Sequence, residues 1–242
     1  MPIIKNEPFH KYLKAMFIDF ALIIIGYLLG SIPSAYVVAR LAKGIDIREY
    51  GSQSTTGANA ARVLGFKLGF TAGMFDIIKG IIATLIAVLV IDSSIYDSSD
   101  ALFEKNVLIA LTGFAAIVGH CFSIYIKFSG GKGAATFLGV LLVFSPWTAL
   151  AIFVTWWVVI GVTRYTSLGN LVMVWISLLT LMFVHDFDLG HTLLGILMVP
   201  FIYYTHRANV SRLLKGEERK LGKKVKLDET AATEESVASE EE

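Results

Sequence analysis

The strongest constraint on this chain is a series of apolar segments long enough to cross a lipid bilayer. A helix needs about 20 apolar residues to span the hydrocarbon layer, and 55% of the 242 residues are hydrophobic. The segments lie at residues 17–41, 68–91, 106–126, 147–162, 168–184 and 190–204. They lack the alternation of polar and apolar residues that marks the strands of membrane barrels. Because only helices and closed barrels satisfy the backbone hydrogen bonds in lipid, we expect helices.

The distribution of charge predicts which connections face the cytoplasm. The segment 43–67 and the residues after the last apolar segment are rich in Lys and Arg, whereas the loops 92–105 and 185–191 carry more acid than base. Basic residues favour the cytoplasmic side of a membrane. An even number of crossings must then separate the loop 127–133 from the C-terminal tail, so the short apolar segment 134–144 must form a short or protein-buried helix. We predict an all-α, polytopic integral membrane protein with about seven transmembrane helices, one of them short, and an external N-terminus.

Composition divides the chain into four regions. Residues 1–16 form an N-terminal tail, for which an interfacial helix is one interpretation, because its lysines would otherwise lie outside against the rule. Residues 17–205 form the transmembrane domain, and residues 206–226 form a basic segment on the cytoplasmic side. Residues 227–242 are acidic and polar, which is typical of a disordered tail. The single cysteine, Cys121, excludes an intrachain disulfide.

The polar segment 45–62 is dense in hydroxyl, amide and arginine side chains, including Ser52, Asn59 and Arg62. Hydroxyls, backbone N–H groups and a bidentate guanidinium all bind phosphate oxygens. An ordinary hydrophilic loop explains the same composition equally well. The segment is therefore a candidate phosphate site, and both interpretations stay open at this point.

A glycine-rich segment, residues 127–133, leads directly into the short apolar segment. Its glycines, Gly130, Gly131 and Gly133, allow backbone N–H groups to turn toward an anion, and the start of a helix adds a partial positive charge. Lys132 adds a full positive charge. The spacing differs from the G-x-x-x-x-G-K-[ST] pattern of a P-loop. A flexible turn between two helices is the alternative, but the double glycine, the lysine and the adjoining helix favour an anion site.

Two further polar pairs occur at a spacing of three residues. His206 and Asn209, just beyond the last apolar segment, would share one face of a helix and could orient a hydroxyl or a phosphate. Alone, such a pair is more often an interfacial anchor. We interpret Asp76 and Lys79 as a structural ion pair, because charges within a membrane are costly unless paired. We infer no metal site, because no cluster of His, Cys and carboxylate residues has the spacing of metal ligands.

Eight short motifs occur in a fixed order along the chain. They are Gly30-Ser31-Ile32-Pro33, Ile45-Asp46-Ile47-Arg48, Gly51-Ser52, Asn59 with Arg62, Asp76-Ile77-Ile78-Lys79-Gly80, Gly119-His120, Gly130-Gly131-Lys132-Gly133-Ala134-Ala135-Thr136 and His206-Arg207-Ala208-Asn209-Val210-Ser211-Arg212-Leu213. As a set, they resemble the bacterial acyl-phosphate:glycerol-3-phosphate acyltransferase family (PlsY type). The resemblance covers about residues 20–222, and the set is far more specific than any one motif.

The resemblance implies an enzyme that transfers a fatty acyl chain from acyl phosphate to the 1-hydroxyl of glycerol 3-phosphate. The products would be lysophosphatidic acid, for phospholipid synthesis, and phosphate. The residues that the resemblance implies to be catalytic are Ser52, Arg62, His206 and Asn209. The residues that it implies to bind substrate phosphate are Gly130, Gly131, Lys132, Gly133, Asn59 and Ser167. Glu218 matches a glutamate that is structural in the family.

The chain departs from the family in the first motif, which usually reads Gly-Ser-Gly-Asn-x-Gly-Ala-Thr-Asn. Gln53 stands at the second glycine position. The next replaced positions, family Asn, Gly, Ala and Thr, are here Ser54, Thr56, Gly57 and Ala58. The class of protein is unaffected, but this loop would bind phosphate with different donors.

The implied reaction needs no cofactor and no metal, because acyl phosphate is already activated and the protein mainly positions reactants and stabilises charge. The expected partners are glycerol 3-phosphate, acyl phosphate, membrane lipid and, as one candidate, the soluble enzyme that produces acyl phosphate; nucleic acid is not expected. The implied location is the bacterial inner (plasma) membrane, with a multi-pass chain and an active site facing the cytoplasm. The alternatives are an organic-anion transporter, whose site would usually lie near the bilayer midplane, and an inactive scaffold of lipid synthesis.

Overall fold

The computed structural model describes residues 7–96 and 101–222, and every regular element within these residues is helical. The helices are α1 (Glu7–Gly30), α2 (Ser34–Lys43), α3 (Gly57–Leu64), α4 (Phe66–Ile91), α5 (Lys105–Cys121), α6 (Ala134–Phe144), α7 (Pro146–Thr163), α8 (Thr166–Val184), α9 (Leu189–Thr205) and α10 (Arg207–Leu214). Short 3₁₀ turns, η1 (Ile47–Glu49) and η3 (Ile124–Ile126), lie in the connections. The all-α prediction is confirmed for the described part of the chain.

Seven apolar segments correspond to the seven predicted crossings. Five are long and apolar enough to cross a membrane: Tyr12–Lys43, Phe66–Ile91, Lys105–Ile126, Pro146–Thr163 and Thr166–Val184. Two shorter apolar helices, Ala134–Phe144 and Leu189–Thr205, complete the set. The N-terminal segment includes residues 7–16 of the predicted tail as the first turns of α1, and its interfacial location stays a prediction. The predicted acidic tail, residues 227–242, lies outside the described residues.

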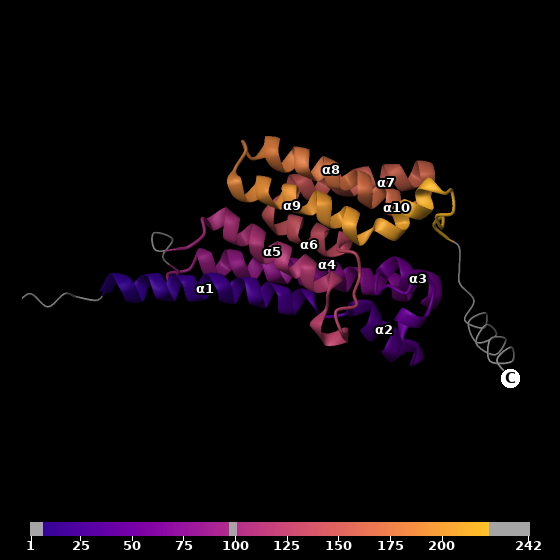
Figure 1. Cartoon of the computed structure of the whole chain (residues 1–242), viewed down its shortest axis with the longest axis horizontal. Helices are drawn as coiled ribbons and strands as arrows, with labels where there is room; N and C mark the ends of the chain where they lie inside the picture. Colours follow the sequence, from indigo (N-terminus) through magenta and orange to yellow (C-terminus); the bar gives the residue numbers. More distant parts are fainter. Residues whose placement is uncertain (1–6, 97–100, 223–242) are drawn as a thin grey trace, which may run out of the picture.

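The first apolar segment differs from a single straight helix. Helix α1 ends at Gly30, and α2 begins at Ser34 after Pro33. Proline lacks a backbone N–H and disfavours helical geometry in the residue before it, so the helix breaks there. The Nζ of Lys79 donates a hydrogen bond to the carbonyl of Ile32 at 2.8 Å, which satisfies a backbone group that the break exposes. The break turns α2 away from the axis of α1 and toward α3 (Figure 1).

The short helix α6 is held in the interior of the bundle. It packs against α4, α5 and α7, and Phe137 and Leu141 on it are fully buried. Helices α4 and α6 approach closely because small residues face each other; a Cβ at Gly139 would lie 2.1 Å from the carbonyl oxygen of Ile77. A helix surrounded by protein does not need the full length of a bilayer span, so its 11 residues suffice.

The buried charges of α4 form the predicted structural pair. Lys79 Nζ lies 2.9 Å from the Oδ1 of Asp76, and both side chains are almost fully buried. The Nδ1 of His120, on α5, lies 3.2 Å from the same oxygen. Asp76 and Lys79 thus each have a close partner, as a low-dielectric interior requires. The network ties α4 to α5 and to the break between α1 and α2.

The connections between helices separate into two ends of the bundle. Figure 1 shows α2, α3 and α10 at one end, and the α4–α5 and α8–α9 connections at the other. The glycine segment 127–133 precedes α6 and contacts α10, so it also lies at the first end. The candidate polar motifs therefore occupy one end of the molecule, as the parity of crossings predicts.

Candidate active site

Glu218 is the hub of the polar cluster at this end. Its Oε1 accepts hydrogen bonds from the hydroxyl of Ser167 at 3.1 Å and the amide of Asn209 at 2.8 Å. Its Oε2 accepts from the Nε of Arg212 at 2.9 Å. The carboxylate is nearly buried, with 5% of its side chain exposed. It joins the start of α8 to α10, which agrees with the structural role implied for it.

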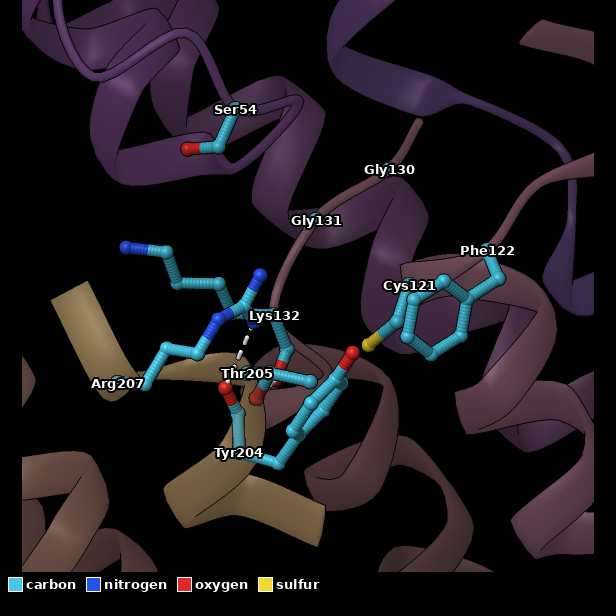
Figure 2. A pocket seen from close by; sticks show the side chains of 9 residues that line it. All are labelled: Ser54, Cys121, Phe122, Gly130, Gly131, Lys132, Tyr204, Thr205 and Arg207. Atoms are coloured by element: carbon cyan, nitrogen blue, oxygen red, sulfur yellow. Dashed lines mark hydrogen bonds between the residues drawn. The ribbon is translucent and has the colours of Figure 1, made fainter. Parts of the chain in front are cut away.

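Lys132 enters this cluster from the glycine segment. Its Nζ donates a hydrogen bond to the Oδ1 of Asn209 at 2.5 Å, and its carbonyl accepts from the hydroxyl of Thr205 at 3.0 Å (Figure 2). Burial, together with the positive charge of Arg212, lowers the pKa of Lys132 to about 8. The ammonium is therefore charged at neutral pH but easily neutralised above it.

Arg62, on α3, brings a further positive charge. Its Nε is buried and has no hydrogen-bond partner among the described residues. Burial and the nearby cation Arg219 lower the pKa of its guanidinium, which Glu218 partly opposes. Arg62 and Lys132 are close enough to repel each other, and both also face Arg212. These four cations share one carboxylate, so the cluster has an excess of positive charge suited to an anion.

Asn59 organises the loop before α3. It is fully buried, and its amide donates to the carbonyls of Ile47 at 3.3 Å, Tyr50 at 3.0 Å and Ser54 at 3.1 Å. Its Oδ1 accepts from the backbone N–H of Ser52 at 2.8 Å. The polar atoms of this side chain are thus committed to the loop backbone. This geometry differs from the direct phosphate contact expected from the sequence, because Asn59 shapes the loop that carries Ser52.

A row of hydroxyls follows from this loop conformation. Ser52 Oγ lies 3.0 Å from Ser54 Oγ, which lies 3.2 Å from Thr56 Oγ1. The backbone N–H of Thr55 donates to the carbonyl of Gly130 at 3.3 Å. The two loops that the sequence identified as separate phosphate candidates are therefore joined into one surface.

In the altered motif, Gln53 has a backbone conformation that usually favours glycine. Its φ is 56°, in the left-handed region, where the related family motif has glycine. Glycine adopts this region without a steric penalty, whereas a residue with a Cβ does so at a cost. The glutamine side chain is exposed and has room to accept the conformation. The chain therefore turns between Ser52 and Ser54 in a conformation that favours glycine, although glutamine stands there.

The glycine segment is built for close packing as well as for charge. A Cβ on Gly131 would lie 2.1 Å from the Nε2 of His120, so only glycine fits against that ring. The backbone N–H of Gly131 donates to the carbonyl of His120 at 3.0 Å. This N–H is therefore not directed at an anion, contrary to the role expected for it. Gly133, with φ of 93°, takes the left-handed conformation at the start of α6.

A pocket of about 190 Å³ opens beside the glycine segment. Its lining consists of Ser54, Cys121, Phe122, Gly130, Gly131, Lys132, Tyr204, Thr205 and Arg207. Figure 2 shows Ser54, Lys132 and Arg207 on one side of this space, with Cys121 and Phe122 on the other. The pocket thus has a polar, positively charged side and an apolar side formed where α5 ends.

His206 occupies the junction between α9 and α10. It is 1% exposed, and its Nδ1 lies 2.9 Å from the carbonyl oxygen of Ile202. Its Nε2 lies 3.1 Å from the amide nitrogen of Asn170. Burial and the nearby charge of Lys132 lower the pKa of His206 to about 4. Because both ring nitrogens are engaged, His206 is placed to position its neighbours rather than to accept a proton from a hydroxyl.

The structure therefore brings the sequence candidates into two adjoining groups. Ser167, Asn209 and Lys132 meet around Glu218, with His206 and Arg62 within electrostatic reach. Ser52 belongs to the neighbouring loop and reaches the pocket through Ser54. The sequence assigned no role to two residues that complete this arrangement, Asn170 and Thr205. Arg212 belongs to the motif that begins at His206, and its spacing of three residues from Asn209 predicts the shared helix face on which it lies. Within the described residues, no group of three or more His, Cys, Asp or Glu side chains could hold a metal ion.

Known proteins with similar sequences belong to one enzyme family. The chain matches the glycerol-3-phosphate acyltransferase family over residues 20–216. A glycerol-3-phosphate acyltransferase from Rippkaea orientalis is 39% identical over 212 residues, which cover 88% of this chain and 96% of the relative. One from Bacillus subtilis is 36% identical over 200 residues, covering 83% and 96%.

Solved structures give the same result for the fold. The crystal structure of PlsY (YgiH), an integral membrane glycerol 3-phosphate acyltransferase, in its glycerol 3-phosphate form matches with a TM-score of 0.74 and 36% identity. The match covers 84% of this chain and 96% of that one. The lysophosphatidic acid form of PlsY matches with a TM-score of 0.72. This polytopic, all-α membrane protein belongs to the glycerol-3-phosphate acyltransferase family.

Proposed function

We propose that this protein transfers a fatty acyl chain from acyl phosphate to the 1-hydroxyl of glycerol 3-phosphate, giving lysophosphatidic acid and inorganic phosphate. The hydroxyl oxygen attacks the acyl carbonyl carbon and forms the ester bond. The bond between that carbon and the phosphate oxygen breaks, its electron pair leaves with phosphate, and the hydroxyl proton is released. Acyl phosphate is an activated mixed anhydride, so the protein contributes mainly positioning and charge stabilisation.

The observation that carries this proposal is the unbalanced positive charge around Glu218. Arg62 has a buried Nε without a partner among the described residues, and Lys132 has a pKa lowered by burial and by neighbouring cations. Without an anion, the unpaired Nε of Arg62 and the repulsion on Lys132 both destabilise the folded protein. A phosphate dianion would supply the missing hydrogen-bond acceptor and neutralise part of the charge. A reaction with two phosphate-bearing substrates meets this need for negative charge better than a reaction with one such substrate.

The pocket supports acyl phosphate as the donor. Lys132 and Arg207 offer charge on its polar side, and Phe122 and Tyr204 contribute aromatic rings where α5 and α9 end. The ring centres of Phe122 and Tyr204 are 6.4 Å apart. A phosphate on the polar side would place its acyl chain toward the apolar helices, which are compatible with hydrocarbon.

The residue roles follow from these contacts. Arg62 and Lys132 hold phosphate, and the segment Gly130–Gly133 positions Lys132. Ser167 and Asn209 present polar groups fixed by Glu218. Ser52 orients oxygens at the edge of the pocket. Asn59 and His206 act by shaping the loop and the α9–α10 junction, respectively.

The charge distribution supports a cytoplasmic active site in the inner membrane. The end that carries the site also carries Arg40 and Lys43 of α2 and the basic residues 206–222, whereas Asp92 and Asp188 lie at the ends of α4 and α9 on the other side of the bundle. Basic residues favour the cytoplasmic side. A site on that side can take water-soluble glycerol 3-phosphate from the cytoplasm and acyl phosphate from the enzyme that makes it. Membership of an enzyme family does not favour the organic-anion transporter or the inactive scaffold.

The test is a donor comparison with purified protein in lipid nanodiscs. Glycerol 3-phosphate and an acyl phosphate should yield lysophosphatidic acid and phosphate, and omission of glycerol 3-phosphate should abolish lysophosphatidic acid formation. Replacing the donor by the matching acyl-coenzyme A should give a far lower rate. Equal turnover with the two donors would refute the acyl phosphate assignment, and absence of product with either would refute the acyltransferase proposal.

A further inference from the structure

We propose that Asn170, held in one orientation by Trp156, is a positioning residue that keeps His206 neutral and in its Nδ1–H tautomer. The proposal deepens the proposed function, because it rests on the placement of His206 next to the phosphate-binding residues. It assigns a role to two residues of the transmembrane helices, Trp156 on α7 and Asn170 on α8, that no sequence motif contains.

The directions of two hydrogen bonds fix the orientation of the Asn170 amide. The indole Nε1 of Trp156 can only donate, and it lies 2.7 Å from the Oδ1 of Asn170. The oxygen of this amide must therefore face Trp156, which leaves its NH₂ group to face His206. That nitrogen lies 3.1 Å from the Nε2 of His206. Because the amide nitrogen can only donate, the Nε2 of His206 must accept and carries no proton.

The contact at Nδ1 of His206 shows where the ring proton lies. The Nδ1 of His206 lies 2.9 Å from the carbonyl oxygen of Ile202, which can only accept. Nδ1 therefore carries the single ring proton. The hydroxyl of Thr205 also lies 3.3 Å from Nδ1, but its proton is directed to the carbonyls of Lys132 and Ile202, so it does not donate to the ring. The chain Trp156, Asn170, His206, Ile202 therefore favours one protonation state. This chain links α7, α8, α9 and the start of α10.

The charged groups that face His206 work in opposite directions. Lys132 disfavours the imidazolium, and Glu218 favours it. The amide N–H of Asn170 also disfavours the imidazolium, as Lys132 does. A protonated Nε2 would point its N–H at the N–H of this amide. Asn170 therefore keeps a further positive charge out of a cluster that already holds Arg62, Lys132 and Arg212.

The tautomer has a structural consequence for the site. The carbonyl of His206 accepts a hydrogen bond from the backbone N–H of Val210, in α10, at 2.9 Å. The preceding residue, Thr205, donates its hydroxyl to the carbonyl of Lys132. A ring fixed between Asn170 and Ile202 thus anchors the junction from which both Asn209 and Lys132 are placed. A charged or rotated ring would loosen this anchor and shift the two phosphate-binding groups.

The test measures the imidazole directly by nitrogen NMR of protein labelled with ¹⁵N-histidine, in lipid or detergent. The His206 signal among the five histidines is assigned by its loss in the His206→Gln variant. At pH 7 the expected spectrum shows a neutral ring protonated at Nδ1. In Asn170→Asp the carboxylate should accept from a protonated Nε2 and make the ring an imidazolium.

Trp156→Phe is a second variant, which introduces no charge. It removes the donor that holds the oxygen of Asn170 in place, so the amide can rotate and the Nε2 signal of His206 should shift or broaden, while the Ile202 carbonyl still holds the proton on Nδ1. Trp157→Phe is the matched control, because Trp157 is 52% exposed on the same helix; its spectrum should equal that of the original protein. A ring that is charged or protonated at Nε2 in the original protein, or neutral and unchanged in both variants, would overturn the proposal.

Kinetics give an independent measure of the same effect. Asn170→Asp should lower kcat roughly tenfold, the loss expected from one displaced positioning hydrogen bond, and add an ionisation between pH 5 and 8. A purely structural defect would lower kcat equally at every pH. The NMR result does not depend on turnover, so an inactive protein would refute the proposed function without touching the assignment of Asn170.

Discussion

Lys132 shows how burial and neighbouring charge set the properties of one side chain. Its ammonium is placed between Asn209 and a group of arginines. In Lys132→Met the chain keeps its length but loses the charge, so the KM for glycerol 3-phosphate should rise. One lost charge-assisted contact costs about 1.5–3 kcal/mol, or roughly ten- to a hundredfold. Steady-state kinetics measure the change. Lys127→Met, at an exposed lysine of the same segment, is the control; equal effects of the two variants would remove Lys132 from the phosphate site.

The lowered pKa of Lys132 also predicts a pH dependence. The ammonium is charged below its pKa of about 8 and loses its proton above it. Because the charged form binds phosphate, kcat/KM for glycerol 3-phosphate should fall as the pH rises through this value. In Lys132→Arg, whose guanidinium stays charged, that fall should disappear even if the rate is lower. A fall of the same size in Lys132→Arg would assign the ionisation to another group.

Gln53 offers a test of backbone strain at a single residue. Its left-handed conformation disfavours any side chain with a Cβ. Gln53→Gly should therefore stabilise the protein by about 0.5–1 kcal/mol, after the greater unfolded-state entropy of glycine is allowed for. Thermal unfolding in detergent measures the shift, and Gln53→Ala should show no such gain. A lower melting temperature for Gln53→Gly would show that the glutamine side chain makes a contact worth more than the strain.

At the scale of elements, the sequence predicted what local chemistry controls. The start of α6 directly after Gly133 follows from the glycine segment and the apolar run behind it. The break before α2 is also local, since it follows from Pro33, although the apolar pattern predicts one segment over residues 17–41. In contrast, the contacts of Asn59 and the use of the Gly131 N–H by His120 depend on partners distant in sequence. No local pattern specifies such tertiary contacts, so the sequence indicated phosphate binding where the structure shows loop support.

Gly131 packs against His120 of α5, so a substitution at Gly131 tests whether this contact supports the glycine segment. In Gly131→Ala the new methyl group would collide with the ring of His120. Overpacking of this kind costs about 1–3 kcal/mol, and kcat should fall because Lys132 moves with the loop. Gly131→Ala combined with His120→Ala should cost less stability than the sum of the two single substitutions, because the methyl group then has no ring to collide with. Gly73→Ala, at a helical glycine with open space around it, should be neutral or slightly stabilising.

At the scale of the whole molecule, the two ends of the bundle differ in charge and in role. This asymmetry predicts which residues a membrane-impermeant maleimide reaches in intact cells. The test uses a Cys121→Ser background, because Cys121 is the only cysteine. Ser94→Cys, exposed at the α4–α5 end, should be labelled from outside. Lys220→Cys, exposed at the end that carries the site, should be labelled only after permeabilisation; the reverse pattern would invert the proposed orientation.

The central claim is that the cation cluster around Glu218 supports acyl transfer to glycerol 3-phosphate. Phosphorus NMR of the protein in nanodiscs with an acyl phosphate and glycerol 3-phosphate follows each phosphate-bearing compound in one sample. The account predicts that the acyl phosphate and glycerol 3-phosphate signals fall together as lysophosphatidic acid and inorganic phosphate rise in equal amounts. Arg62→Met should abolish both products, whereas Arg40→Met, at an exposed arginine of α2, should retain them. Phosphate release without lysophosphatidic acid, or full activity in Arg62→Met, would contradict the account.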